Sequence, residues 1–352
     1  MKTSLKSKFA FILTACILIG MLPGSAGRGS AKAENNLKDK QFEKQAAGTD
    51  TLEQGKIDYV KLEAEQGSSL RFAVIGDYGN YANDAQSPEV DVANLIKSWA
   101  PDIILTTGDN NYNDGTEATI DDNIGKFFHE FISPYQVKHG AGGQVNRFFP
   151  SLGNHDWHTQ DVDDLPYPYL DYFTLPGNER YYDFTWGPVH FFALDSDSRE
   201  PDGVGLSSVQ ASWLQSRLAA STSPWKIVFF HHAPYSSGEH GSMSWMQWPF
   251  AAWGADVVLS GHDHTYERIS PLGDILYFVN GLGGKSIYDF RDEEVLGSQV
   301  QYNGDYGAML VDVFIGRIRF QFINRNGVVI DDFSLVKQFE YSYLPILQKT
   351  SP

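Results

Sequence analysis

The sequence predicts an α/β fold in which two mixed β-sheets pack face to face, with helices on the outside. Through residues 70–280, short continuous apolar runs alternate with amphipathic helical patterns, as in buried strands joined by helices. Residues 308–335 instead alternate apolar and polar side chains between turn residues, which is typical of antiparallel hairpins. Hydrophobic residues make up 42% and charged residues 20% of the 352-residue chain, which is enough apolar material for a large core.

Six buried strands, three helices and a β-meander are predicted along the chain. The strands are the apolar runs at residues 70–75, 103–107, 148–152, 227–230, 257–260 and 275–279. Helical patterns occupy residues 90–98, 120–131 and 207–220, and in the last of them serine precedes an apolar face with helical spacing. The meander has strands at residues 308–315, 317–323 and 328–335. Because no linker separates these patterns, residues 67–340 are expected to form one domain, followed by a tail at 341–352.

The N-terminus carries the features of a secretory signal peptide at residues 1–26. Three lysines precede an apolar run at residues 9–22, and small residues follow it. The run is shorter than the ~20 residues that a membrane-spanning helix needs, so no transmembrane anchor is expected. The sequence therefore predicts a secreted or periplasmic protein.

The rest of the N-terminal region and the overall charge narrow the partners. Cys16 is the only cysteine, and its Leu-Thr-Ala-Cys context leaves lipid anchoring open as a minor alternative. Residues 27–66 are polar and are predicted to be an arm or tether. The 27 basic and 44 acidic residues give a net charge of −17, which disfavours nucleic acid as a partner. A small phosphorylated substrate remains compatible if a local positive centre overrides this charge.

Metal-ligating residue types follow five of the apolar runs. They occur in Gly76-Asp77-Tyr78-Gly79, Gly108-Asp109, Gly153-Asn154-His155-Asp156, His231-His232 and Gly261-His262-Asp263-His264. Each motif alone is an ordinary turn, but the carboxyl ends of strands in an open α/β sheet line a common crevice. A buried cluster of carboxylates and imidazoles needs a cation, since uncompensated buried charges cost several kcal/mol each. The sequence therefore predicts one convergent metal site.

Taken in order, these motifs resemble those of the calcineurin-like metallophosphoesterases. Tyr112, three residues after Asp109, makes the sequence similar to the purple acid phosphatases within that superfamily. His240, nine residues after His231 in a Glu-His-Gly turn, is similar to the small tartrate-resistant type. The resemblance extends over about residues 70–335 and identifies 67–340 as a catalytic domain.

The resemblance implies a dinuclear metal centre held by seven side chains. Asp77, Tyr112 and His264 are expected to hold the first metal, Asn154, His231 and His262 the second, and Asp109 both. His155 is expected to donate to the phosphate, and His240 to protonate the leaving group or position the substrate. Carboxylate and phenolate donors suit Fe(III), whereas imidazole and amide donors suit a divalent Fe, Zn or Mn ion.

The expected function is that of a secreted acid phosphatase, which hydrolyses phosphate monoesters with a water or hydroxide activated by two metals. A phosphodiesterase or nucleotide hydrolase on the same core is the first alternative, and a non-enzymatic binding protein on the same scaffold is the second. His232 stays open as a ligand in place of His231. Tyr112 as a core aromatic and His240 as a solvated loop residue are the simpler alternatives. The oligomeric state is not predicted.

Two loops, at residues 157–188 and 236–250, are expected to shape the pocket. The second carries Met243, Trp245, Met246 and Trp248, which either stack on a substrate ring or pack the loop down.

Overall fold

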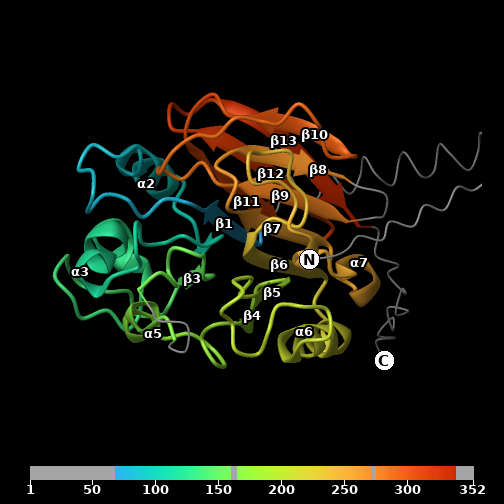
Figure 1. The fold of residues 1–352 in the computed structure, drawn as a ribbon, viewed down its shortest axis with the longest axis horizontal. Coiled ribbons are helices and arrows are strands. Elements are labelled where there is room, and N and C mark those ends of the chain that lie inside the picture. The colour runs from blue at the N-terminus through green and yellow to red at the C-terminus, as the bar shows by residue number, and fades with distance from the viewer. Residues whose placement is uncertain (1–67, 160–164, 271–274, 338–352) are drawn as a thin grey trace, which may run out of the picture. The chain divides into compact units, whose positions relative to one another are not determined.

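Two β-sheets build the part of the chain that the computed structural model describes, residues 68–159, 165–270 and 275–337 (Figure 1). The first sheet has the order β13-β12-β11-β1-β2-β3. Its strands are β1 (Leu70–Ile75), β2 (Ile103–Thr106), β3 (Phe148–Pro150), β11 (Gly307–Val313), β12 (Arg317–Asn324) and β13 (Val329–Val336). β1, β2 and β3 run parallel, and the meander joins them through the antiparallel pair β1–β11. The meander thus extends the first sheet.

The second sheet has the order β10-β8-β9-β7-β6-β5-β4. Its strands are β4 (Tyr182–Trp186), β5 (Val189–Ala193), β6 (Trp225–His232), β7 (Val257–Gly261), β8 (Tyr266–Ile269), β9 (Leu276–Asn280) and β10 (Ser298–Tyr302). The neighbours β5, β6, β7 and β9 pair in parallel, while β4, β8 and β10 pair antiparallel. Both sheets are therefore mixed, as the sequence predicts.

The sheets pack face to face through aromatic side chains. Phe72 of β1 meets Phe191 of β5 edge to face at 5.3 Å between ring centroids, and Tyr266 of β8 stacks on Phe322 of β12 at 4.2 Å. Along β5, Phe191 belongs to this central core, whereas its neighbour Phe192 belongs to a second cluster outside the sheet. Because successive side chains of a strand point to opposite faces, a strand covered on both faces must be apolar throughout.

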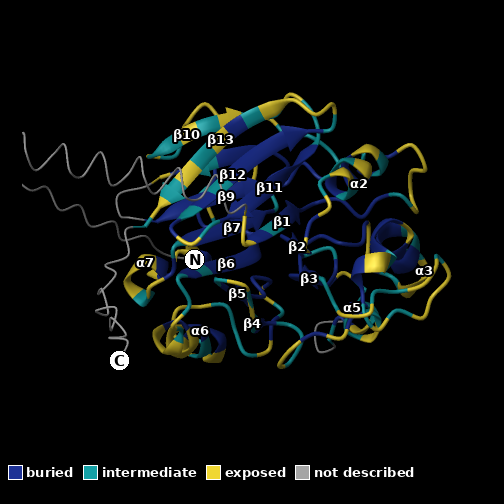
Figure 2. Ribbon diagram, turned by 180° about the vertical axis from the view of Figure 1, so that it is seen from behind, coloured by how far each residue is buried: buried dark blue, intermediate teal, exposed yellow. Residues whose placement is uncertain are grey.

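Helices cover the outer faces (Figures 1 and 2). On the first sheet, α2 (Glu89–Ser98) buries Val92, Ala93 and Ile96. On the second sheet, α6 (Val209–Ala220) and α7 (Phe250–Trp253) bury Leu214, Leu218 and Phe250 against the outer side of β5 and β6. Figure 2 shows buried central strands and exposed residues on the outer sides of these helices. The predicted fold class is confirmed.

Several local predictions need correction. Residues 120–131 form a broken series: α3 (Glu117–Ile120), a π-turn (Asp121–Gly125), α4 (Lys126–Phe128) and a 3₁₀ turn (His129–Phe131). The expected loop at 157–188 contains α5 (Tyr167–Tyr172) and β4, and the cap of α6 is Ser208. The 236–250 segment contains a 3₁₀ turn (Ser244–Met246).

Strands β4, β5, β8 and β10 were not expected from the sequence. Polar residues obscure two of these strands: His190 in β5 bonds Asp183 and Ser221, and Glu267 in β8 accepts hydrogen bonds from Ser237. β4 and β10 are the two edge strands of the second sheet. Their residues are only partly buried, so their sequences lack a continuous apolar run.

The predicted signal peptide at 1–26, the arm at 27–66 and the tail at 341–352 lie outside the described residues. Within the described ranges, no helix combines the length and apolar character required to cross a bilayer.

Candidate metal centre

The carboxyl ends of parallel strands from both sheets meet at one place, and the predicted ligands lie there. The first group of ligands gathers around the phenol oxygen of Tyr112. This Oη lies 2.7 Å from Asp109 Oδ2, 3.3 Å from Asp77 Oδ1 and 3.2 Å from His264 Nε2. His264 Nε2 is also 3.3 Å from Asp77 Oδ1. These four side chains follow β1, β2 and β7, so the first predicted metal site is assembled from both sheets.

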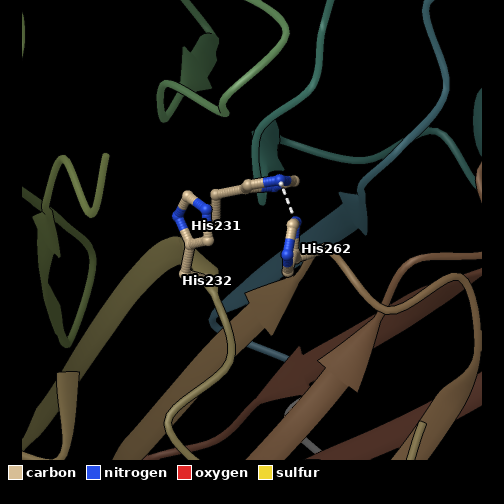
Figure 3. Close-up of side chains that lie close together, drawn as sticks. All are labelled: His231, His232 and His262. Atoms are coloured by element: carbon tan, nitrogen blue, oxygen red, sulfur yellow. Dashed lines mark hydrogen bonds between the residues drawn. The ribbon is translucent and has the colours of Figure 1, made fainter. Parts of the chain in front are cut away.

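The second group of ligands gathers around His231 Nε2. This nitrogen lies 3.0 Å from Asn154 Oδ1 and 3.4 Å from Asp109 Oδ1. It also lies 3.1 Å from His262 Nδ1 (Figure 3). Asp109 thus turns one carboxylate oxygen to each group, Oδ2 to Tyr112 and Oδ1 to His231. That is the placement a carboxylate shared by two cations requires.

Unusual backbone conformations aim these side chains inward. Asp77, Asp109 and His262 have positive φ angles of 56°, 53° and 70°. A non-glycine residue in such a conformation costs about 1–3 kcal/mol and persists only where its surroundings hold it. Gly108 has a φ of +85°, and a Cβ there would lie 2.7 Å from the Cβ of His231. Glycine therefore lets the tip of β2 approach the tip of β6 closely.

The donor set fits a pair of cations. Asp77 and Asp109 are 0% and 2% exposed, and both carboxylates face the same phenol. Burial raises the pKa of Asp77 well above its ordinary value, and the charge of Asp109 raises it further. Burial acts in the same direction on Asp109, but His231 and His155 hold the pKa of Asp109 below its ordinary value. The two adjacent buried carboxylates repel each other, and a bound cation offsets that repulsion.

The imidazoles of His262 and His264 are suited to be ligands because burial favours their neutral form. Burial lowers the pKa of His264 to about 4, and it also lowers the pKa of His262. A neutral imidazole keeps one nitrogen lone pair, which is what a metal binds.

The hydrogen bonds of the two adjacent histidines decide between His231 and His232 as ligand. His231 Nδ1 lies 2.8 Å from the carbonyl oxygen of Thr107, which only accepts, so Nδ1 carries the proton and Nε2 keeps its lone pair. His232 Nδ1 lies 2.9 Å from Ser196 Oγ, and the same oxygen already accepts from the His232 backbone N–H. Ser196 is fully buried, and its hydroxyl has no other acceptor among the described residues, so we assign its O–H as the donor to Nδ1, which leaves the proton of His232 on Nε2. The geometry favours His231.

His155 and His240 lie beside the two groups of ligands. The backbone N–H of His155 donates to Asp109 Oδ1 at 2.9 Å, and its half-buried ring lies 4.3 Å from the ring of Tyr112. Its Nδ1 donates to the carbonyl of Asn113 at 2.5 Å. His240 is exposed, yet its ring stacks on His262 at 4.3 Å. Both rings therefore border the centre.

The large apolar residues Met246, Trp248 and Trp245 of the 236–250 segment differ in burial. Met246 and Trp248 are buried and pack the segment down, as the simpler alternative expects. Trp245 is 41% exposed, and its ring lies 5.8 Å from that of His232.

Sequence reasoning missed several residues that contact the centre. Lys285 Nζ donates to Asn80 Oδ1 at 2.9 Å and to Asn113 Oδ1 at 2.8 Å, and it lies 4.8 Å from the centroid of the Tyr112 ring. A usable signal existed, because Lys285 follows β9 after Gly281, Gly283 and Gly284, in the same strand–glycine pattern as the other motifs. Ser196 and Arg199 follow β5, which the sequence did not reveal as a strand.

A family model described as calcineurin-like phosphoesterase matches residues 70–266, more than half of the chain. The chain belongs to the calcineurin-like phosphoesterase family. Membership confirms the resemblance of the motifs and makes the protein a hydrolase of phosphoric ester bonds. It also implies a dinuclear metal centre, in agreement with the donor groups formed by Asp77, Asp109 and His231 and by His231, His232 and His262.

Curated relatives of this phosphoesterase are acid phosphatases. Tartrate-resistant acid phosphatase type 5 of Rattus norvegicus is 25% identical over 266 residues, which cover 67% of this chain and 78% of the relative. Purple acid phosphatase 15 of Arabidopsis thaliana is 30% identical over 251 residues, which cover 61% of this chain but 45% of the plant protein.

Solved structures show the same fold. A purple acid phosphatase from yellow lupin, PPD1, has a TM-score of 0.62 at 19% identity, with 76% of this chain and 53% of the lupin chain covered. GAP50, described as the anchor in the inner membrane complex of Plasmodium, has a TM-score of 0.59 at 19% identity, with 78% and 90% covered. This phosphoesterase chain thus spans about half of the lupin enzyme and most of GAP50.

Proposed function

We propose that this protein is a secreted, metal-dependent acid phosphatase that hydrolyses phosphate monoesters. The observation that carries the proposal is the Tyr112 phenol, held 2.7 Å from Asp109, 3.3 Å from Asp77 and 3.2 Å from His264. A phenol oxygen among carboxylates is a hard donor set, and hard donors suit Fe(III). The imidazoles and the amide of the second group suit a divalent Fe, Zn or Mn ion.

The side chains divide into ligands and groups that handle the substrate. The ligands are Asp77, Tyr112 and His264 for the first ion, Asn154, His231 and His262 for the second, and Asp109 for both. When bound, the ions activate a water molecule as nucleophile and offset the charge of the phosphate. His155, fixed through Nδ1 by Asn113, turns its other nitrogen towards the centre, where it binds the phosphate. His240, exposed beside His262, gives a proton to the leaving oxygen.

Two measurements on the purified protein test this function. Elemental analysis is expected to give two metal ions per chain, one of them iron. At acidic pH, p-nitrophenyl phosphate is expected to be hydrolysed with a higher kcat/KM than bis(p-nitrophenyl) phosphate. The opposite preference would support the phosphodiesterase alternative. A protein that holds both ions but cleaves neither ester would support the binding-protein alternative. We consider this alternative because GAP50, which has a similar fold, is described as an anchor.

Replacing Tyr112 with phenylalanine tests the proposed iron ligand. If the phenol oxygen binds Fe(III), the oxidised protein absorbs visible light by charge transfer, and Tyr112→Phe removes this band. The matched control is Tyr78→Phe, because Tyr78 is equally buried but donates its hydroxyl to Asn110. Visible spectra of the wild type and both variants provide the comparison. A band that survives in Tyr112→Phe, or a colourless wild type holding only zinc or manganese, would contradict the proposed iron site.

A further inference from the structure

The loop that follows β5, residues 195–199, contacts Asn154 of the second group after β3 in one sheet, and His232, the neighbour of His231, at the end of β6 in the other. Ser196 Oγ accepts a hydrogen bond from the backbone N–H of His232 at 2.9 Å, next to the ligand His231 at the end of β6. Arg199 reaches the other side of the site, where Asn154 and His155 follow β3. The loop is itself tied to α6, because the Asp195 backbone N–H donates to Gln210 at 2.8 Å.

Arg199 forms hydrogen bonds that hold the turn of Asn154. Its Nη2 donates to the carbonyl oxygen of Asn154 at 3.0 Å, and its Nη1 donates to the carbonyl oxygen of Trp157 at 3.0 Å. The guanidinium is oriented by Asp197, which accepts from Nε at 2.7 Å and from Nη2 at 2.9 Å. A planar guanidinium fork fixed by a carboxylate is well suited to hold two carbonyl groups at a set spacing.

The turn is also fixed from its opposite side. Asp156 accepts hydrogen bonds from the backbone N–H groups of Gly153 at 2.9 Å and of Asn110 at 3.2 Å. These contacts join the ends of β2 and β3. Arg199, from the loop that follows β5 in the second sheet, holds the same turn through its own hydrogen bonds. Because four of its five donor directions are already used by protein oxygens, Arg199 acts on the turn rather than on a substrate.

We propose that Arg199 is a positioning residue for the second metal ion, because it sets the Asn154–His155 turn at the distance from His231 and His262 that the ion requires. Asn154 Oδ1 lies 3.0 Å from His231 Nε2, across the boundary between the two sheets. β3 and β6 belong to different sheets and do not pair, so the hydrogen bonds of Arg199 help to connect the two sheets at this point. The first ion depends less on this turn. Asp77, Tyr112 and His264 have no hydrogen bond to the turn among the described residues, and the shared Asp109 has one, from the backbone N–H of His155. The inference rests on the proposed assignment of the second group as a metal site.

Arg199→Gln tests the inference, with Arg180→Gln as the matched control. Arg180 is a partly buried arginine of the same region, but it pairs with Glu200 at 2.9 Å and Asp202 at 3.1 Å. Metal content is measured after dialysis of the metal-loaded protein against increasing concentrations of a chelator. In Arg199→Gln, one ion per chain is expected to be lost at a roughly 10–100-fold lower chelator concentration, which is the usual effect of removing an outer partner of a ligand. The other ion stays, and kcat falls more than KM rises.

A purely structural role predicts a different pattern. Since Arg199→Gln leaves Asp197 without its partner, the double variant Asp197→Asn/Arg199→Gln removes both charges and is measured in parallel. The inference is supported if Arg199→Gln and the double variant each lose one ion while Arg180→Gln keeps both ions. Retention of both ions, or equal weakening of both, overturns it even if the melting temperature falls. Because metal content is the readout, a wild type that binds two ions but cleaves only diesters would refute the proposed substrate and leave this inference standing.

Discussion

Asp109→Asn is expected to reduce phosphatase activity by more than about 10³-fold, since even an outer partner of a metal ligand is worth roughly 10–100-fold. Asp109 is the only residue of the predicted set that faces both ligand groups, at 2.7 Å from Tyr112 Oη and 3.4 Å from His231 Nε2. Asparagine keeps the shape but loses the negative charge that offsets the repulsion between two cations. Both ions are therefore expected to bind more weakly, which elemental analysis after dialysis measures directly.

Replacing the neighbouring carboxylate, in Asp77→Asn, is expected to stabilise the metal-free protein. In the absence of cations, Asp77 and Asp109 are buried side by side, and the charge of Asp109 raises the pKa of Asp77. Removing one charge relieves this repulsion, and each 1 kcal/mol gained raises Tm by about 2–4 °C in a domain of this size. Thermal melting in excess chelator, compared with melting in metal, separates the two effects. Loss of activity together with gain of stability is typical of a functional site whose charges are held against their own repulsion.

The control for Asp109→Asn is Asp331→Asn. Asp331 of β13 is also a buried carboxylate, but its partners are Arg268 at 2.7 Å and Tyr266 at 2.8 Å, both on β8, and none of its hydrogen bonds among the described residues involves a predicted ligand. Its replacement is expected to lower Tm and to leave both metal ions and kcat unchanged. If Asp109→Asn binds two ions with unchanged affinity, the shared-carboxylate assignment is wrong. If Asp77→Asn melts earlier than wild type in chelator, the expected gain of stability is contradicted.

The sequence predicted that these side chains converge, because they lie at strand ends. A buried parallel strand is a continuous apolar run, and its carboxyl end is marked by the first polar residue. Asp77, Asp109 and Asn154 each come directly after a glycine near the end of such a strand. Such motifs predict convergence without any knowledge of the loops between them. The two-layer fold follows from the same runs, since strands that are apolar on both faces need a cover on each side.

The supporting contacts could not be predicted, because they join segments far apart in the chain. The carbonyl of Thr107 sets the proton of His231 from 124 residues away, and Ser196 sets that of His232 from 36 residues away. Neither relation leaves a periodic pattern. Arg199 was hidden for a second reason, since His190 interrupts the apolar run of β5 and conceals the strand whose end carries the loop. These residues orient the predicted ligands, and such contacts are seen only in the three-dimensional structure.

His231→Gln and His232→Gln are expected to differ by a large factor, although the residues are adjacent and both buried. His231→Gln removes the nitrogen that faces Asn154, His262 and Asp109, so the second ion is lost and kcat falls by more than about 10²-fold, beyond the usual cost of an outer partner. His232→Gln is expected to keep both ions, because its Nδ1 accepts from Ser196 and its Nε2 carries the proton. Elemental analysis and kcat on p-nitrophenyl phosphate measure the contrast.

The reverse result would exchange the two roles. If His232→Gln loses the second ion while His231→Gln keeps it, the imidazole of His232 must change tautomer in the loaded protein, so that Nδ1 donates to Ser196 Oγ across the same 2.9 Å contact and Nε2 is free to bind. Ser196→Ala separates these cases. With His231 as ligand, removing the hydroxyl leaves the metal content unchanged; with His232 as ligand, it frees Nδ1 and alters the affinity for the second ion. The prediction is therefore that Ser196→Ala and His232→Gln retain two ions per chain, and that His231→Gln retains one.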